Sequence, residues 1–192
     1  QGSVQENISW QSSTGSSADF LKYNIGSASQ LESGAINIAT FTDDYAGTIR
    51  QGNPGYAGAG TAPDIGAWEL GGIASDLTGP YISYTSLDNN SCLTGRTLSS
   101  VIIIDASGVN ITSGTRPRLY YRKSTNADTY VDNTNATNGW KYVEATGSGG
   151  SPFSFAADYS LLSGGAPVVN DVIHYFVTAQ DLAGTPNVSI SN

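Results

Sequence analysis

The 192-residue sequence predicts an all-β protein, and three observations support this fold class. Charged residues make up only 12% of the chain, against about 25% in a typical globular protein. Their place is taken by Ser, Thr, Asn and Gly, which are poor helix formers, while Thr and the 11 tyrosines suit strands. Helical periodicity is confined to one short candidate, SADFLKYNI, whereas short β-like runs separated by turn residues recur along the chain.

A change in composition near LGGIASDLTGP divides the chain. Gly71–Gly72 and Gly79–Pro80 bracket a flexible joint, so residues 73–79 are predicted to form a linker. Residues 1–72 contain only short β-like runs, in NISW, GAINIAT and APDIGAWEL, which are too few to close a sandwich. Such a segment can instead form the last coils of a solenoid, in which each coil packs on its neighbour.

Residues 80–192 are predicted to form one antiparallel sandwich. Its seven strand-like runs are PYISYTSL (80–87), LSSVIIIDAS (98–107), RPRLYYRKS (116–124), GWKYVEAT (139–146), PFSFAADYS (152–160), DVIHYFVTAQD (171–181) and NVSIS (187–191). In VIHYFVTAQ, alternation sets His174 and Phe176 on one face and Tyr175 and Val177 on the other. The length and the turn spacing match an immunoglobulin-like or fibronectin type III-like module, whose last strand is predicted to be truncated at Asn192.

The stretch FTDDYAGTIRQGNPGYAGAGTAPDIGAWEL resembles the end of right-handed parallel β-helix proteins of the pectate-lyase-like kind. Those proteins often close with D-x-x-G-x-x-R followed shortly by D-I-G-A-(Y/W)-E. The matching residues here are Asp44, Gly47, Arg50 and the hexapeptide from Asp64 to Glu69. The resemblance covers residues 20–70, and it implies that residues 1–72 are the C-terminal coils and cap of a parallel β-helix whose body lies outside this chain.

A second resemblance covers the sandwich. The segments DLTGPYISYTSL, VIIIDASGV, RLYYRKS, FSFAADYSLL and DVIHYFVTAQDLAG are similar to the Ig-like repeats of very large secreted surface proteins of Gram-negative bacteria. Some of those proteins are type IX secretion cargo and gliding-motility adhesins. The resemblance implies an extracellular or cell-surface location and a partner that is the remainder of a longer chain or a surface assembly. It carries over no catalytic residue.

Composition excludes several function classes. The net charge is −8 with eight basic residues, so a dense cationic face for nucleic acid cannot be assembled. No run of 18 apolar residues is present, so no membrane insertion is expected. Cys92 is the single cysteine, which leaves no partner for an intrachain disulfide. The chain has no Met and opens at Gln1, which indicates a processed or excised piece of a longer protein.

Asp64 and Glu69 are the first candidates for acid–base chemistry. In a strand, positions five apart face opposite sides, so these two carboxylates are not expected to converge as a catalytic pair. A structural cap fits better, in which Trp68 covers the open end of the coils and Arg50 pairs with Asp64 or Glu69. The predicted cap residues are Asp44, Arg50, Asp64, Trp68 and Glu69.

No catalytic residue and no cofactor-binding residue is predicted. His174 is the only histidine, so a Ser-His-Asp or Cys-His device would have to use it. It lies within a strand pattern beside Tyr175 and Phe176, and the chain has no G-x-S-x-G elbow. We therefore expect a strand residue with a partly exposed ring. Cys92 lies in the turn NNSCLTG, where Arg96 is the nearby cation, and is expected to be an inert thiol.

Three aspartates at the ends of predicted strands are candidate calcium ligands, namely Asp76, Asp105 and Asp181. Calcium coordinates several oxygens that such loops can supply, although the sequence has no EF-hand-type loop. In DASG and DLAG, the aspartate can equally accept hydrogen bonds from turn amides. No other cofactor is predicted.

The aromatic residues of the sandwich offer a glycan platform as a further alternative. Tyr120, Tyr121, Trp140 and Tyr142 are candidates, but adjacent positions face opposite sides, and such residues usually fill a core. The candidate glycan contacts are Tyr121, Trp140 and Tyr142. The sequence as a whole favours a non-catalytic structural or adhesive segment of a large secreted bacterial cell-surface protein. The alternatives are an accessory region of a polysaccharide-degrading β-helix enzyme and a carbohydrate-binding module.

Overall fold

The computed structural model describes residues 6–91, 93–146 and 149–191, so Cys92 lies outside the described residues. Its described regular elements are strands and one 3-10 helix, which confirms the all-β prediction. The chain divides into two compact units, Gln1–Asp76 and Leu77–Asn192. The division falls within the segment 73–79 that the sequence predicts as a linker. In the part of the chain that the structure describes, no helix is long and apolar enough to cross a membrane.

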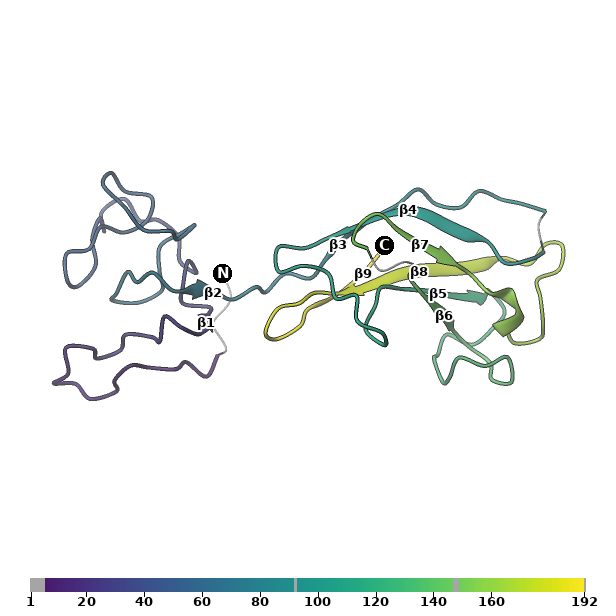
Figure 1. The fold of residues 1–192 in the computed structure, drawn as a ribbon, viewed down its shortest axis with the longest axis horizontal. Coiled ribbons are helices and arrows are strands. Elements are labelled where there is room, and N and C mark those ends of the chain that lie inside the picture. The colour runs from purple at the N-terminus through teal and green to yellow at the C-terminus, as the bar shows by residue number, and fades with distance from the viewer. Residues whose placement is uncertain (1–5, 92, 147–148, 192) are drawn as a thin grey trace. The chain divides into compact units, whose positions relative to one another are not determined.

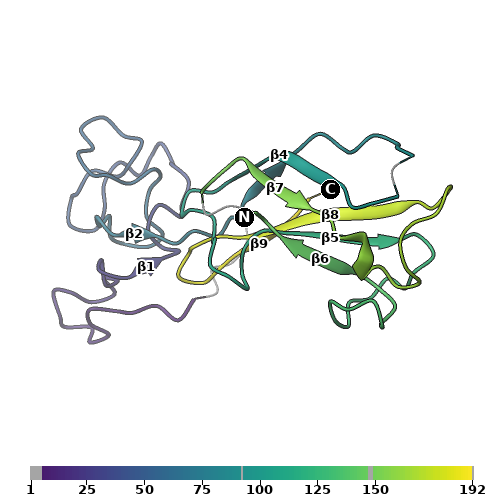
Figure 2. The same cartoon turned by 45° about the vertical axis from the view of Figure 1, so that its right-hand side comes forward.

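The second unit consists of two antiparallel sheets that face each other (Figures 1 and 2). The three-stranded sheet has the order β3-β4-β7, with β3 at Tyr81–Ser83, β4 at Thr97–Ile104 and β7 at Phe153–Ala156. The four-stranded sheet has the order β6-β5-β8-β9, with β6 at Lys141–Glu144, β5 at Arg118–Lys123, β8 at Ile173–Gln180 and β9 at Val188–Ile190. All seven predicted runs are thus confirmed as strands. A short 3-10 helix, η1 at Tyr159–Leu161, follows β7.

The core of the second unit lies between these sheets. Alternation along β8 buries Val177 and Ala179 and leaves His174 exposed, which confirms the predicted faces. In β4, the alternation slips between Leu98 and Val101, where the pairing with β7 is irregular and Ser100 adopts φ +58. The extra residue of this irregularity lets both side chains point inward.

The first unit has little regular structure. Its strands β1 (Ala28–Ser29) and β2 (Ile73–Ala74) form one two-residue parallel pair. The strand-like runs NISW, GAINIAT and APDIGAWEL are not strands, so this part of the prediction is wrong. The described residues show an all-β chain with that single parallel pair, and the parallel β-helix stays a prediction.

The first unit also buries few apolar side chains. Among its described residues, the buried hydrophobic side chains are those of Tyr23 and Leu31. Large apolar side chains are instead exposed along its length, at Trp10, Phe20, Leu21, Ile25, Ile36, Ile38, Phe41, Tyr45 and Ile73. Local structure in this unit therefore depends mainly on polar contacts, which are concentrated around the predicted cap residues.

Candidate functional site

Asp64 is the most deeply buried of the predicted cap residues, at 1% exposed. Its Oδ1 accepts a hydrogen bond from the amide of Ser33 at 2.9 Å, and its Oδ2 accepts one from the amide of Leu70 at 2.7 Å. Oδ2 also lies 2.8 Å from the hydroxyl of Tyr23. Burial raises the pKa of this carboxyl and outweighs the opposite effect of the hydrogen bonds. Its oxygens thus serve as partners for backbone amides that have no strand neighbour.

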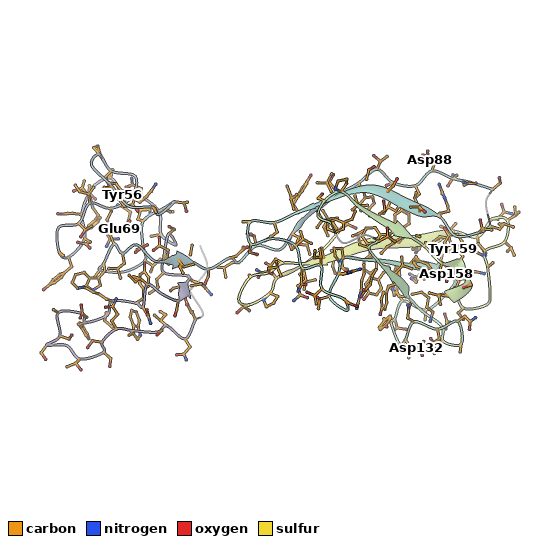
Figure 3. All side chains as sticks on the ribbon, viewed as in Figure 1. Tyr56, Glu69, Asp88, Asp132, Asp158 and Tyr159 are labelled. Atoms are coloured by element: carbon orange, nitrogen blue, oxygen red, sulfur yellow. The ribbon has the colours of Figure 1, made fainter. Side chains whose placement is uncertain are left out.

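Glu69, labelled in Figure 3, also accepts hydrogen bonds from backbone amides and is 7% exposed. Its Oε1 accepts from the amide of Gln51 and its Oε2 from the amide of Asp64, both at 3.0 Å. The Oε2 atom lies 3.5 Å from Nη1 of Arg50, so Glu69 is the ion-pair partner that the sequence left undecided between two candidates. The side chain of Glu69 therefore folds back onto the start of its own hexapeptide.

Asp44 connects the first half of the motif to the second. Its Oδ1 accepts from the amides of Ala46 and Thr48, each at 2.8 Å, and its Oδ2 accepts from the amide of Glu69 at 2.9 Å. Partial burial raises the pKa of Asp44, but the hydrogen bonds from these three amides, that of Glu69 first, outweigh it and lower the pKa. The ionised form is thus the one that the fold stabilises.

Arg50 binds the opposite partners, the backbone carbonyls. Its Nη1 donates to the carbonyl of Asp64 at 3.0 Å, and its Nη2 donates to the carbonyl of Gly66 at 2.6 Å. Its Nε donates to the carbonyl of Asp43 at 3.3 Å. Gly66 has φ +115, a conformation that favours glycine, so the bend around it depends on both the glycine and the guanidinium. We call Asp44, Arg50, Asp64 and Glu69 the carboxylate–arginine network.

Trp68 is half-buried beside this network. Its Nε1 donates to the carbonyl of Phe20 at 2.9 Å, and the ring of Tyr45 meets it edge-on at 5.4 Å between centroids. The Nζ of Lys22 lies 4.6 Å from the centre of the indole. These contacts tie residues 20–22 and 45 to the hexapeptide.

The network has the chemistry of a structural device. Asp64 and Glu69 are not on opposite faces of a strand, because the hexapeptide forms a bend around Gly66. Yet both carboxylates are more than nine-tenths buried and are bonded to amides, so neither is placed to exchange a proton with a substrate. Sequence reasoning missed Tyr23 and Glu32, which contact this site from a segment outside the motif. No spacing in the sequence signals them.

Two of the three aspartates predicted as calcium ligands, Asp105 and Asp181, lie close together in the second unit, with carboxylate oxygens within 4.8 Å of each other. Asp76 is the last residue of the first unit. Oδ1 of Asp105 accepts from the amide and the hydroxyl of Ser107, both at 2.8 Å. Asp181 is fully buried, and its two oxygens accept from the amide and the side-chain amide of Asn187 at 2.8 and 2.7 Å. The turn-stabilising alternative is confirmed for both residues. Calcium binding stays a prediction, which a calorimetric calcium titration tests.

The outer side of the four-stranded sheet carries an aromatic layer. Tyr120 on β5 lies opposite Tyr142 on β6 and Phe176 on β8. Its ring centroid is 5.5 Å from that of Tyr142 and 5.3 Å from that of Phe176. Trp140 meets Phe176 edge-on at 4.7 Å, and Tyr130 meets Tyr120 at 6.0 Å. We call these five residues the aromatic face.

Tyr121 does not belong to this face, so its prediction as a glycan contact is wrong. It points into the core at 1% exposed, and its hydroxyl donates to the carbonyl of Asp158 at 2.7 Å. The cause is the period-two alternation, which sends Tyr120 outward and Tyr121 inward. Trp140 and Tyr142 do lie on one outer face. Tyr130 and Phe176 were missed, although the alternation in β8 set Phe176 on the same face as His174.

Arginines cover the aromatic face. The Cζ of Arg118 lies 4.2 Å from the ring centre of Tyr142, and the Cζ of Arg122 lies 4.8 Å from that of Trp140. Arg118 also pairs with Glu144 at 3.2 Å, and Arg122 pairs with Asp128 at 3.5 Å. Beside them lies a groove of about 400 Å³, whose lining includes Tyr120, Tyr130, Trp140, Phe176, Arg116, Val188 and Ile190.

A second groove, of about 740 Å³, lies at another part of the second unit, where residues of the segments 87–91, 93–96 and 167–173 line it. Two of its charged residues have partners of their own: Arg96 donates to the carbonyl of Asp88, and Asp171 pairs with Lys123 at 3.2 Å. His174 is exposed on the outer face of β8, opposite Arg122 in register. Among the described residues, no nucleophile and no carboxylate is hydrogen-bonded to it.

Comparison of the chain with protein-family models, with curated proteins and with solved structures finds no match.

Proposed function

We propose that the chain is a non-catalytic structural and adhesive segment of a large secreted bacterial cell-surface protein. In this proposal the first unit is the closing coils of a parallel β-helix, and the second is an immunoglobulin-like spacer or presenting module. The observation that carries the proposal is the use of Asp44, Arg50, Asp64 and Glu69. Every one of these side chains is bonded to backbone groups, as in a device that holds chain segments together.

The exposed apolar side chains of the first unit support a role as closing coils. Ile36, Ile38 and Phe41 are 60%, 53% and 64% exposed. A solenoid coil buries such side chains against the coil before it, since it has no core of its own. In this proposal, preceding coils of the same β-helix cover these exposed side chains, as the resemblance of the motif implies. The strand orders β3-β4-β7 and β6-β5-β8-β9 support the immunoglobulin-like part of the proposal.

Two assays of the purified chain test this function. In the first, uronate-containing and neutral polysaccharides are incubated with the chain, and new reducing ends and unsaturated products are measured; none are expected. Cleavage that is lost in Glu69→Gln would overturn the non-catalytic reading. In the second, a fluorescent apolar dye reports exposed hydrophobic surface. Dye binding is expected to decrease in an Ile36→Ser/Ile38→Ser variant, and an unchanged signal counts against the closing-coil role.

A carbohydrate-binding module is the second candidate function, favoured by the groove beside the aromatic face. Aromatic rings provide apolar faces for pyranose rings, and polar side chains at the edge bind hydroxyls. Tyr130 is half exposed and lines the groove with Arg116. Glycan binding that is abolished by Tyr130→Ala and Trp140→Ala, but kept by Tyr81→Ala on the other sheet, would establish this function. Absence of any glycan ligand on an array removes it.

A further inference from the structure

Glu32 and Asp64 share one tyrosine hydroxyl in the first unit. The Oη of Tyr23 lies 2.7 Å from Oε2 of Glu32 and 2.8 Å from Oδ2 of Asp64. A phenol has a single O–H hydrogen, and an ionised carboxylate has acceptors only. The hydroxyl can therefore satisfy one of the two contacts. In the other contact, the phenol oxygen and a carboxylate oxygen face each other with lone pairs alone at hydrogen-bond distance. Such a contact is favourable only when a second proton lies between the two oxygens.

The surroundings favour retention of that second proton. Tyr23, Glu32 and Asp64 are 2%, 5% and 1% exposed. Two ionised carboxylates that are so close together and shielded from water repel each other. The usual outcome is that one of them stays protonated. Arg50 touches Asp64 but donates to its backbone carbonyl, and its ion-pair partner is Glu69. Its charge therefore acts mainly on a different carboxylate.

Backbone and hydroxyl donors around the pair can stabilise one negative charge. The amide of Gly72 donates to Oε2 of Glu32 at 2.7 Å, and the hydroxyl of Ser33 donates to Oε1 at 2.9 Å. The amides of Leu70 and Ser33 donate to the carboxyl of Asp64. A carboxyl oxygen has two lone pairs, so these bonds are compatible with a proton on Oδ2.

We propose that Tyr23, Glu32 and Asp64 hold one proton in addition to the tyrosine's own, so that the two carboxyls together carry a single negative charge at neutral pH. Oδ2 of Asp64 donates this proton to Oη of Tyr23, whose own hydrogen is donated to Oε2 of Glu32. The assignment to Asp64 agrees with its raised pKa, which is caused first by burial and increased by the charge of Glu32. The pKa of Tyr23 is also raised, by burial and by hydrogen bonds to both carboxylates, so the phenol keeps its hydrogen.

This arrangement makes the first unit more stable in mild acid than at neutral pH. Carboxyls of an unfolded chain ionise near pH 4, so above that pH folding takes up a proton. A group whose pKa is raised by folding contributes its stability fully below the unfolded pKa and loses it as pH rises through the folded pKa. One linked proton changes the unfolding equilibrium constant by up to tenfold per pH unit within that window.

Infrared spectroscopy of the whole chain at pH 7, with ¹³C-carboxyl-labelled aspartate, tests the proposal directly. We expect the carbonyl band of one protonated carboxylic acid, shifted by the label and lost in Asp64→Asn. Asp19→Asn is the matched control, because Asp19 is exposed and pairs with Lys22 at 3.0 Å. A wild-type spectrum in which every carboxyl is ionised would overturn the proposal. If the band is not shifted by the aspartate label and disappears in Glu32→Gln, the proton is on Glu32 instead of Asp64.

Amide hydrogen exchange gives a second readout in the same chain. Protection of the Ser33 and Leu70 amides, corrected for the intrinsic effect of pH, is expected to fall as pH rises above about 4. In Asp64→Asn this fall should disappear, since an amide NH₂ donates to Tyr23 without titrating. Protection that is flat or rises with pH in the wild type contradicts the proposal. If Asp64→Asn does not fold, the wild-type infrared spectrum decides alone.

Discussion

Among the described residues of the second unit, thirteen buried apolar residues from the two sheets and the segments beside them form one core, whereas those of the first unit bury Tyr23 and Leu31. The first unit instead buries the carboxylates of Glu32, Asp64 and Glu69. Within one chain, one unit is thus held mainly by apolar packing and the other mainly by bonds between side chains and the backbone.

The difference shows how a segment with almost no sheet satisfies its backbone. Strands of the second unit pair their amides and carbonyls with one another, as buried backbone groups must be paired. In the first unit, the amides of Asp64, Glu69 and Leu70 bond to side-chain carboxylates, while Arg50 binds the carbonyls of the same bend. Four side chains therefore replace a neighbouring strand.

The largest expected effect is in the core of the second unit. Phe155 on β7 is 0% exposed, and Phe155→Ala is expected to cost about 3–5 kcal/mol because it leaves a cavity. Urea denaturation followed by near-UV circular dichroism measures it. Ile104→Ala is the control, since Ile104 is 54% exposed on β4 and should cost less than about 1 kcal/mol.

The same variant tests whether the two units are energetically distinct. Protection of the Ser33 and Leu70 amides in the first unit should be unchanged by Phe155→Ala. An equal loss of protection in both units would mean that one cooperative transition covers the chain, and the contrast between the units would then have no energetic basis.

The next effect is expected in the carboxylate–arginine network. Glu69→Ala leaves the amides of Gln51 and Asp64 without their acceptor and Arg50 without its ion pair. Buried groups left unsatisfied cost about 1–3 kcal/mol each, so the first unit should lose about 3 kcal/mol. Amide exchange measures this loss, and Asp19→Ala on the exposed surface serves as the control. A loss below about 0.5 kcal/mol would show that the network is not what holds the unit.

The sequence predicted the two units with different success, for a physical reason. Period-two alternation in runs such as VIHYFVTAQ reports burial directly, so the seven strands that the structure describes in the second unit were all predicted, and the faces of β8 are right. The boundaries were predicted too long, as for β3, because strand ends depend on pairing partners. The period also sets Tyr120 outward and Tyr121 inward, and only the register showed which of them joins Trp140 and Tyr142.

In the first unit, the residues that matter were found through a motif, and their geometry was not. The hexapeptide was expected to be a strand, because Ile65, Ala67 and their neighbours suit one. The bend instead follows from Gly66 and from carboxylates that bond to nearby amides, which no hydrophobic period reports. Tyr23 and Glu32 lie 41 and 32 residues before Asp64 in the chain, and the contacts that bring them together are visible only in the fold.

A smaller effect separates the units by their response to acid. The pKa of Asp44 is lowered in the fold, because amide hydrogen bonds outweigh its partial burial. Its contribution is present above the unfolded pKa and is lost as pH falls through the folded pKa, so the first unit should weaken below about pH 4. Asp44→Asn should remove this loss of stability in acid, and it should lower the stability of the first unit by about 1 kcal/mol at pH 7. Hydrogen exchange of the Glu69 amide between pH 3 and 7 measures this pH dependence. If the variant loses stability in acid as the wild type does, other carboxyls cause the loss.

The smallest expected effect concerns the arginines on the aromatic face, where the second unit also uses polar side chains. Arg118 lies 4.2 Å from the ring of Tyr142, donates to the carbonyl of Gly114 and pairs with Glu144. At a partly exposed site, the cation–π contact should contribute about 0.5–1 kcal/mol, and the ion pair less than about 1 kcal/mol. A double-mutant cycle of Arg118→Gln and Tyr142→Leu measures the first contribution.

Salt distinguishes the two contributions of Arg118. Raising the ionic strength to about 1 M screens the exposed ion pair to Glu144, whereas the contact between Arg118 and the ring of Tyr142 should persist, because it is partly desolvated. The matched cycle in the first unit uses Lys22→Gln and Trp68→Leu, where the ammonium lies 4.6 Å from the indole. Equal coupling in both units would mean that cation–π contacts are common to them, and that the contrast lies only in how each unit satisfies its buried backbone. Zero coupling between Arg118 and Tyr142 would show that this cation–π contact contributes nothing measurable to the second unit.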